Sequence, residues 1–88
     1  MKFLAVSQNR GDPTALLAAE SQRMADLVTR GTVEHVYLKA DYSGAVLIVE
    51  AADPQQAEAE LATLPLVIAG LTSFTVTAII TAPTLSTI

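Results

Sequence analysis

Two Asp-Pro pairs constrain the fold of this chain most strongly. Asp12-Pro13 and Asp53-Pro54 are typical helix starts, because the Asp carboxylate accepts the free N–H groups of a first turn and proline has no N–H to leave unpaired there. The first pair predicts a helix that runs to about Arg30, where Gly31 supplies a left-handed cap. The second predicts a shorter helix, from residue 55 to about 64.

Runs of strand-forming residues lie on both sides of these helices, at 3–8, 33–40, 45–50 and 72–81. Turn residues at 41–44 join the middle two runs as a hairpin, and Pro83 ends the last run before a tail of residues 84–88. The order strand, helix, strand, strand, helix, strand predicts an α+β, ferredoxin-like fold. It has a four-stranded antiparallel sheet with both helices on one face.

The length and apolar content predict one domain that associates with itself. The 88 residues of 9.2 kDa leave room for a single domain over 1–88, and 51% of them are hydrophobic. Both faces of the strands are apolar, as Val46 and Ile48 alternate with Leu47 and Val49. We therefore expect a second copy to cover the free face of the sheet, as a dimeric α+β barrel or a larger homo-oligomer.

Charge and residue counts exclude several classes of protein. A net charge of −4 argues against nucleic acid and anionic membrane surfaces as partners. The chain has no Cys, only one His and no glycine-rich phosphate loop, so we expect neither a metal nor an organic cofactor. No apolar run approaches the roughly 20 residues of a spanning helix. Polar residues at 7–10 interrupt any signal peptide, which predicts a cytoplasmic protein.

Glu20 lies where the first helix should present apolar side chains. On a helical wheel of about 100° per residue, the apolar stripe from Leu16 to Val28 is centred near 60°, and Glu20 falls at about 40°. An apolar environment disfavours the charged form of a carboxylate, so such a group can take and return a proton near neutral pH. Glu20 is therefore a candidate catalytic residue. The alternative is a structural ion pair with Arg23.

His35, Tyr37 and Lys39 share one face of the second strand, because side chains alternate along a strand. If that face meets the helices, these residues lie near Glu20 and supply a second acid–base group, a phenol donor and a cation for an anionic substrate. If it meets a partner sheet or solvent, they are interface groups without chemistry. The sequence leaves both possibilities open.

With these residues assigned, the chain resembles the muconolactone delta-isomerase family over most of its length. The resemblance is carried by the order and spacing of five segments: MKFLAV, AAESQRMADLVTRG, EHVYL, AVLIVEA and ELATLPLVIAGLTSFTVT. It implies a ferredoxin-like domain in a dimeric barrel, often assembled further into rings. It also implies cofactor-free isomerisation of an unsaturated lactone by proton transfer.

The resemblance also bears on individual residues. Glu20 matches the glutamate of the family's first helix, and His35 also matches. The family's strand around His35 is rich in Arg and Trp, whereas residues 33–39 here have Lys39 as their only Lys or Arg. Lys39 and Arg23 are therefore the candidate counter-charges for an anionic substrate such as muconolactone.

These observations predict a cofactor-independent isomerase or cyclase for a small unsaturated lactone, ketone or polyketide-like molecule. Glu20 would move the proton while His35, Tyr37 or Lys39 polarises an oxygen. A cofactor-free oxygenase of the same barrel fold is a related alternative. A non-catalytic small-molecule binder or assembly module is a different one. An enzyme should hold Glu20 in an enclosed cavity, and a scaffold should hold it in an ion pair beside a filled interior.

Overall fold

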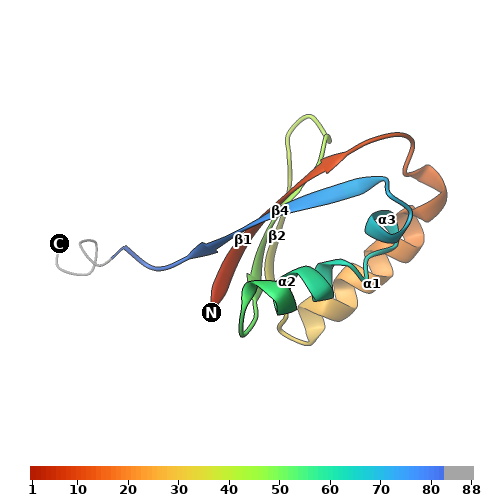
Figure 1. The fold of residues 1–88 in the computed structure, drawn as a ribbon. Coiled ribbons are helices and arrows are strands. Elements are labelled where there is room, and N and C mark those ends of the chain that lie inside the picture. The colour runs from red at the N-terminus through yellow and green to blue at the C-terminus, as the bar shows by residue number, and fades with distance from the viewer. Residues whose placement is uncertain (83–88) are drawn as a thin grey trace.

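The computed structural model describes residues 1–82, which form a four-stranded antiparallel sheet with helices on one face (Figure 1). Along the chain the elements are β1 (Lys2–Asn9), a 3₁₀ turn η1 (Thr14–Leu16), α1 (Leu17–Thr29), β2 (Val33–Leu38), β3 (Ala45–Glu50), α2 (Pro54–Leu61), α3 (Pro65–Ile68) and β4 (Thr72–Ile79). The strand order β2-β3-β1-β4 confirms the ferredoxin-like α+β fold. Pro83 and the expected tail lie outside the described residues.

The two Asp-Pro pairs start helices in different ways. Asp53 caps α2 as expected, since its side chain accepts the Gln56 N–H at 2.7 Å. Asp12 accepts the backbone N–H of Thr14 at 3.0 Å and also the Thr14 hydroxyl. The turn that follows Asp12 is η1, and the α-helical geometry of α1 begins only at Leu17. None of the helices in residues 1–82 is long and apolar enough to cross a membrane.

A short helix that the sequence pattern did not indicate follows α2. The second helix was expected to reach Leu64, but α2 ends at Leu61 and α3 begins at Pro65. Leu64 is extended, with φ −71° and ψ 132°, and the fixed φ of Pro65 suits the first position of the new helix. The Leu-Pro-Leu segment therefore starts α3, which packs against α1 and β4.

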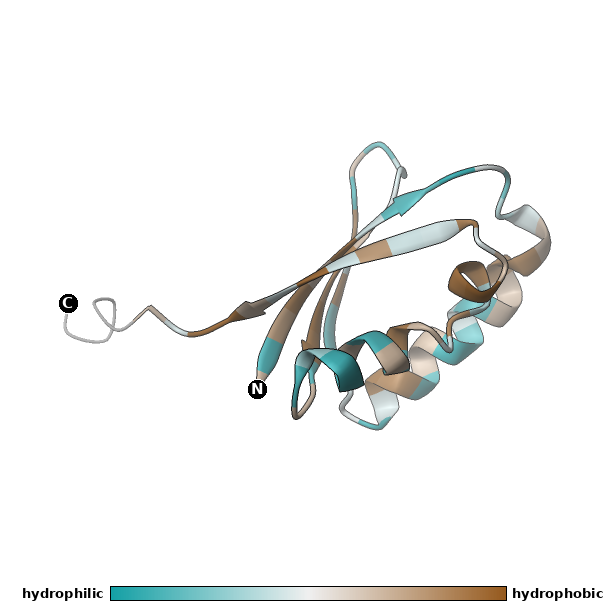
Figure 2. Cartoon of the chain, viewed as in Figure 1, coloured by the Kyte–Doolittle hydropathy of each residue, from teal (hydrophilic) through white to brown (hydrophobic). Residues whose placement is uncertain are grey.

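The core lies between the sheet and its helices. Its largest fully buried side chains come from both layers: Phe3, Leu27, Val33, Leu47, Val49 and Leu64. In this layer α1 packs on β2, and α2 packs on β4. Figure 2 shows hydrophobic segments along the strands and in α3. Thus α1 covers the β2 side of the sheet and α2 covers the β4 side, while α3 lies beside α1.

A bulge in β2 determines which side chains face the helices. Val33 pairs with Val49 and His35 pairs with Ile48, so Glu34 is an extra residue between them. Val33 and Val36 consequently lie on the same, helix-facing side of the sheet, although a regular strand would turn them to opposite faces. His35 is directed to the other face.

The other face of the sheet has no helix over it. Cross-strand pairs there join Leu4 with Ile48 and Val6 with Val46, and all four side chains are only partly buried. Tyr37 lies beside Val46 and is 58% exposed. The face is therefore a largely apolar surface in the isolated chain.

Candidate active site

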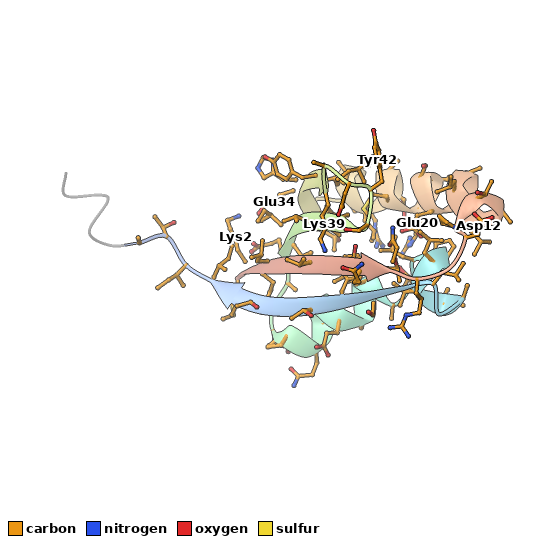
Figure 3. The ribbon with its side chains drawn as sticks, turned by 90° about the horizontal axis from the view of Figure 1, so that it is seen from above. Lys2, Asp12, Glu20, Glu34, Lys39 and Tyr42 are labelled. Carbon is orange, nitrogen blue, oxygen red and sulfur yellow. The ribbon has the colours of Figure 1, made fainter. Side chains whose placement is uncertain are left out.

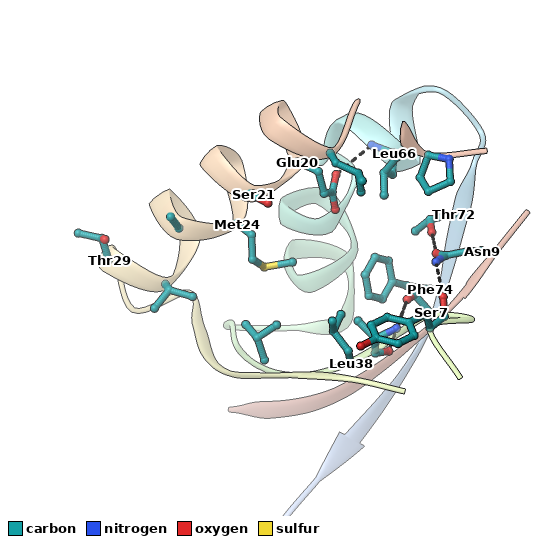
Figure 4. Close-up of a pocket in the computed structure, with 18 residues that line it drawn as sticks. Ser7, Asn9, Glu20, Ser21, Met24, Thr29, Leu38, Leu66, Thr72 and Phe74 are labelled. Atoms are coloured by element: carbon teal, nitrogen blue, oxygen red, sulfur yellow. Dashed lines mark hydrogen bonds between the residues drawn. The ribbon is translucent and has the colours of Figure 1, made fainter. Parts of the chain in front are cut away.

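A cavity of about 770 Å³ opens between α1 and the helix-facing side of the sheet (Figure 4). Its walls come from β1, α1, β2, α3, β4 and the turn between β2 and β3. Most of the wall is apolar, including Leu17, Met24, Val28, Val36 and Phe74. Leu17 and Val28 are 48% and 43% exposed because they border this space instead of packing into the core. The cavity has the size of an ordinary small-molecule site.

Glu20 projects from α1 into the wall of this cavity and reaches toward α3 (Figure 4). Its Oε1 accepts the backbone N–H of Leu66 at 3.0 Å. Because α3 begins at Pro65, this N–H belongs to the first turn, where backbone donors have no partner within the helix. The bond fixes the carboxyl group at the junction of α1 and α3, and it engages only one of the two carboxylate oxygens.

Arg23 does not form the ion pair with Glu20 that was the structural alternative. Its guanidinium donates to Asp26 on α1 and to the Thr63 hydroxyl, the latter at 3.0 Å. Arg23 is also absent from the described lining of the cavity. The structure therefore does not bring this candidate substrate-binding cation to the cavity.

Three polar side chains of the sheet face the cavity at the ends of β1 and β4. The Thr72 hydroxyl donates to Asn9 Oδ1, and Asn9 Nδ2 donates to the Tyr42 carbonyl at 3.4 Å. Ser7 Oγ accepts the Ala45 N–H at 2.7 Å. An amide nitrogen has two N–H groups, so Asn9 can donate a further hydrogen bond to a bound molecule. Figure 4 places this group across the cavity from Met24.

Gly44 allows the turn to approach β1 this closely. A Cβ atom on Gly44 would lie 2.0 Å from the Ser7 carbonyl oxygen, a distance that no side chain tolerates. Tyr42, in the same turn, adopts a left-handed φ of 62°, which is uncommon for a bulky residue. Both residues border the cavity. The turn is therefore held in place by close backbone contact with β1.

The structure does not bring His35, Tyr37 and Lys39 to Glu20. His35 and Tyr37 leave β2 on the uncovered face of the sheet, opposite the cavity, and Lys39, which directly follows β2, does not line the cavity either. There the rings of His35 and Tyr37 stack with centroids 6.2 Å apart, and Lys39 Nζ donates to Gln8 at 3.3 Å. The β2 bulge sets the face to which His35 and Tyr37 point, so of the two possibilities that the sequence leaves open the structure has the one in which they face away from the helices.

Within residues 1–82, no group of three or more His, Asp or Glu side chains is placed to hold a metal ion. Glu20 stands alone as an acidic side chain in the described wall of the cavity. Chemistry at this site therefore centres on one carboxylate, the amide and hydroxyl groups of the sheet, and an apolar surface.

Comparison with known proteins establishes the fold. No protein-family model and no curated protein sequence matches the chain. The structure is similar to that of 5-chloro-2-hydroxyhydroquinone dehydrochlorinase from Burkholderia phenoliruptrix AC1100, solved in complex with 2,5-dihydroxybenzoquinone. The TM-score is 0.74 at 21% sequence identity, and the similarity covers 93% of this chain and 96% of that one. The two proteins share a fold.

Several groups of the site were missed by sequence reasoning. The first strand was expected to end at residue 8, whereas Asn9 is the last residue of β1 and pairs with Thr72. The Leu66 N–H gave no signal because α3 was not expected. A polar residue at the end of each of two neighbouring strands was the available clue to Asn9 and Thr72, since neighbouring antiparallel strands bring such ends together.

Proposed function

We propose that the chain is a cofactor-independent isomerase or cyclase that moves a proton within a small unsaturated lactone, ketone or polyketide-like substrate. The observation that carries this proposal is Glu20, a carboxylate with one oxygen held by the Leu66 N–H in the wall of an apolar cavity. Hydrogen bonding to a backbone group fixes the carboxylate without consuming its second oxygen. A positioned carboxylate of this kind is suited to general acid–base catalysis.

The proton transfer can be written for an unsaturated lactone. The Glu20 carboxylate takes a proton from the carbon between the carbonyl and the double bond, and the electron pair of that C–H bond enters a dienolate. The Glu20 carboxylic acid then returns the proton to the far end of the dienolate. The double bond moves into conjugation with the carbonyl, so the product is an isomer and no oxidant or co-substrate is used. For a lactone that is already conjugated, such as muconolactone, the same two transfers run in the opposite direction, from the γ-carbon to the α-carbon.

Negative charge develops on the carbonyl oxygen during this step, and hydrogen-bond donors should face it. In place of His35, Tyr37 or Lys39, the proposal assigns this role to the free N–H of Asn9, with Thr72 holding the Asn9 side chain. Both residues belong to the sheet, so they are positioned by strand pairing and not by a loop.

The comparisons support an enzyme in general terms. The structural neighbour is named as an enzyme, and its complex contains a small cyclic molecule. The resemblance of the sequence to the muconolactone delta-isomerase family supports proton transfer more specifically, since Glu20 matches the helix-one glutamate. The proposal departs from that family in its substrate-binding groups, which here lie on β1 and β4.

We also propose that a second copy covers the free face of the sheet, giving the dimeric barrel. Leu4, Val6, Val46 and Ile48 form a continuous apolar surface there. His35 and Tyr37 would then be interface residues. The cavity is on the opposite side of the sheet, so the dimer would support the fold without closing the site.

A non-catalytic binding module remains a second candidate because of one contact. The bond from Leu66 to Glu20 gives the carboxylate a structural role at the start of α3, which a binder would also need. The two candidates differ in what Glu20→Gln does. The amide keeps an oxygen to accept the Leu66 N–H, so a binder retains its ligand affinity, while an enzyme loses its base.

The test uses α-angelica lactone and muconolactone as probes and follows isomerisation by ultraviolet absorbance. We expect the wild type to convert at least one of them and Glu20→Gln to be about 100-fold slower or worse, the usual scale for a lost acid–base group. Glu58→Gln, an exposed substitution on α2, is the matched control and should retain activity. Equal rates in Glu20→Gln and wild type would refute the proposal. A wild type inactive on both probes would favour the binding module.

A further inference from the structure

The cavity lacks positive charge. Among the residues 1–82 that line it there is no Lys, Arg or His, and Glu20 contributes a negative charge. Residues 83–88 contain no Lys, Arg or His either, so that segment has no basic side chain to add. An anionic substrate would therefore meet a carboxylate in a largely apolar space without a counter-charge, which is unfavourable.

Most basic residues of the chain bind partners outside the cavity. There are only five Lys and Arg residues, and four of them donate to partners outside the cavity: Lys2 to Glu34, Arg23 to Asp26, Arg30 to Glu60, and Lys39 to Gln8. Figure 3 shows Lys2 and Glu34 together, well away from Glu20. The fifth, Arg10, follows β1 in an exposed position and does not line the cavity.

The cavity has a polar end and an apolar end. Glu20, Asn9, Thr72 and Ser7 gather on the side near α3 and the ends of β1 and β4, as Figure 4 shows. Farther along α1 the wall is mainly small and apolar, with Ala25 and Val28 opposite β2, and Thr29 contributes a hydroxyl at the end of the helix. A molecule that fills the space would present one polar edge and a longer apolar body.

We infer that the cavity selects an uncharged ring compound with a hydroxyl or carbonyl on one edge, and discriminates against carboxylates of the same shape. This inference rests on the proposed function for the identity of the site, but it concerns binding alone. The polar edge contacts Glu20 and Asn9, and the apolar body lies against Met24, Val28 and Phe74. The volume of about 770 Å³ falls within the range of sites for drug-sized molecules, which is more room than a single small ring requires.

The experiment compares two probes with the same ring system, 2-naphthol and 2-naphthoate, at neutral pH. Binding is measured by titration with ¹⁵N-labelled protein, where the amides of Leu66, Ser7 and Phe74 report the cavity. We expect 2-naphthol to bind and to shift these amides, with an affinity about tenfold or more above that of 2-naphthoate. Arg10→Ala should leave both affinities unchanged.

A variant that adds a cation to the cavity tests the same preference for 2-naphthol over 2-naphthoate. Val28→Lys puts a cation at the exposed rim of the cavity, and it should raise 2-naphthoate affinity until the preference narrows or reverses. Gln22→Lys adds the same charge to α1 at an exposed residue outside the lining, and it should preserve the preference of the wild type.

Three results would overturn the inference: wild-type protein that binds 2-naphthoate as tightly as 2-naphthol, amide shifts confined to residues outside the cavity, or no binding of either probe. The outcome is separable from the proposed function, because proton transfer by Glu20 is measured as turnover. A protein that isomerises lactones but binds both probes equally would retain the function and lose the selectivity.

Discussion

Glu20 makes a contact with a distant helix that an ordinary surface glutamate does not make. Its carboxylate accepts the Leu66 N–H at 3.0 Å from a helix that is separated from it by more than forty positions in sequence. The same carboxylate borders a cavity whose other walls are mostly apolar. The N–H at the start of α3 thus fixes the position of the Glu20 carboxylate, and the walls of the cavity give it an apolar environment. Glu20 is a candidate base because both conditions are met.

Asp12 makes the stability of the fold depend on pH. The Thr14 hydroxyl and N–H donate to its carboxylate and hold the pKa of Asp12 below its usual range. The unfolded chain has the ordinary pKa of about 3.9, so these bonds stabilise the fold above that pH, and the contribution is lost as the pH falls through the lower folded value. We expect the melting temperature of Asp12→Asn to fall less steeply with acid than that of the wild type.

Circular dichroism melts across the acidic range measure this difference. Asp41→Asn is an independent comparison, since hydrogen bonds from Ser43 likewise lower the pKa of Asp41. Each substitution should remove part of the acid dependence. If the melting temperatures of Asp12→Asn and wild type fall equally with acid, the hydrogen bonds from Thr14 do not make the pKa of Asp12 lower in the folded than in the unfolded chain, and the prediction is wrong.

The candidate residues differ in how far the sequence alone could predict their place in the site. Glu20 was found because a helix has a fixed period, and one charged residue within an apolar stripe stands out against it. His35, Tyr37 and Lys39 were assigned to one face of a strand, but the sequence did not show on which side of the sheet that face lies. Asn9 and Thr72 were missed because their proximity arises from long-range pairing of β1 with β4.

The β2 bulge explains why the sequence does not predict the side of the sheet that His35 and Tyr37 face. A bulge inserts one residue and reverses the alternation beyond it. Val33 is 1% exposed in the core, and a regular strand would have turned His35 and Tyr37 to the same side as Val33. No turn residue or proline marks Glu34 as the extra position. The strands, α1 and α2 were predictable, because Asp-Pro starts and β-branched runs are local signals, whereas α3 was not expected.

A substitution at Gly44 tests whether the β2–β3 turn is packed tightly against β1. Gly44→Ala would place a Cβ atom 2.0 Å from the backbone oxygen of Ser7, so the turn or β1 must shift. We expect a loss of stability of about 1–3 kcal/mol, the usual cost of overpacking. Because Gly44 and Ser7 both line the cavity, the affinity for 2-naphthol should fall as well.

Urea denaturation and the probe titration measure the two effects of Gly44→Ala. Ala40→Ser, in the same turn, is the control, because it also adds one heavy atom, but at an exposed residue that does not line the cavity. It should remain close to the wild type in both measurements. A Gly44→Ala protein of unchanged stability would mean that the turn is not held against β1 as the structure has it.

The uncovered apolar face of the sheet predicts that the protein associates with itself. Light scattering coupled to size exclusion should give twice the chain mass of 9.2 kDa or a larger multiple. Ile48→Lys puts a charge in the centre of the apolar face and should shift the protein toward the monomer, because an unpaired charge is costly to bury. Gln55→Lys on the exposed start of α2 should leave the mass unchanged.

A stable wild-type monomer at micromolar concentration would contradict the dimeric barrel. The fold class would be unaffected by that result, since the strand order and helix placement stand within one chain. The sequence indicated self-association through apolar residues on both strand faces. It could not show that the helix-facing side is itself only partly filled, because the cavity depends on how far α1 lies from the sheet.

The most direct test of the central claim, that Glu20 transfers a proton in this cavity, is deuterium incorporation from D₂O. Wild-type protein and Glu20→Gln are incubated with α-angelica lactone, and proton NMR follows the loss of signal at the carbon between the carbonyl and the double bond. Catalysed exchange is predicted for the wild type, and exchange near the uncatalysed background for Glu20→Gln, while the Leu66 amide still reports bound lactone in both. Catalysed exchange at the same rate in Glu20→Gln would contradict the claim.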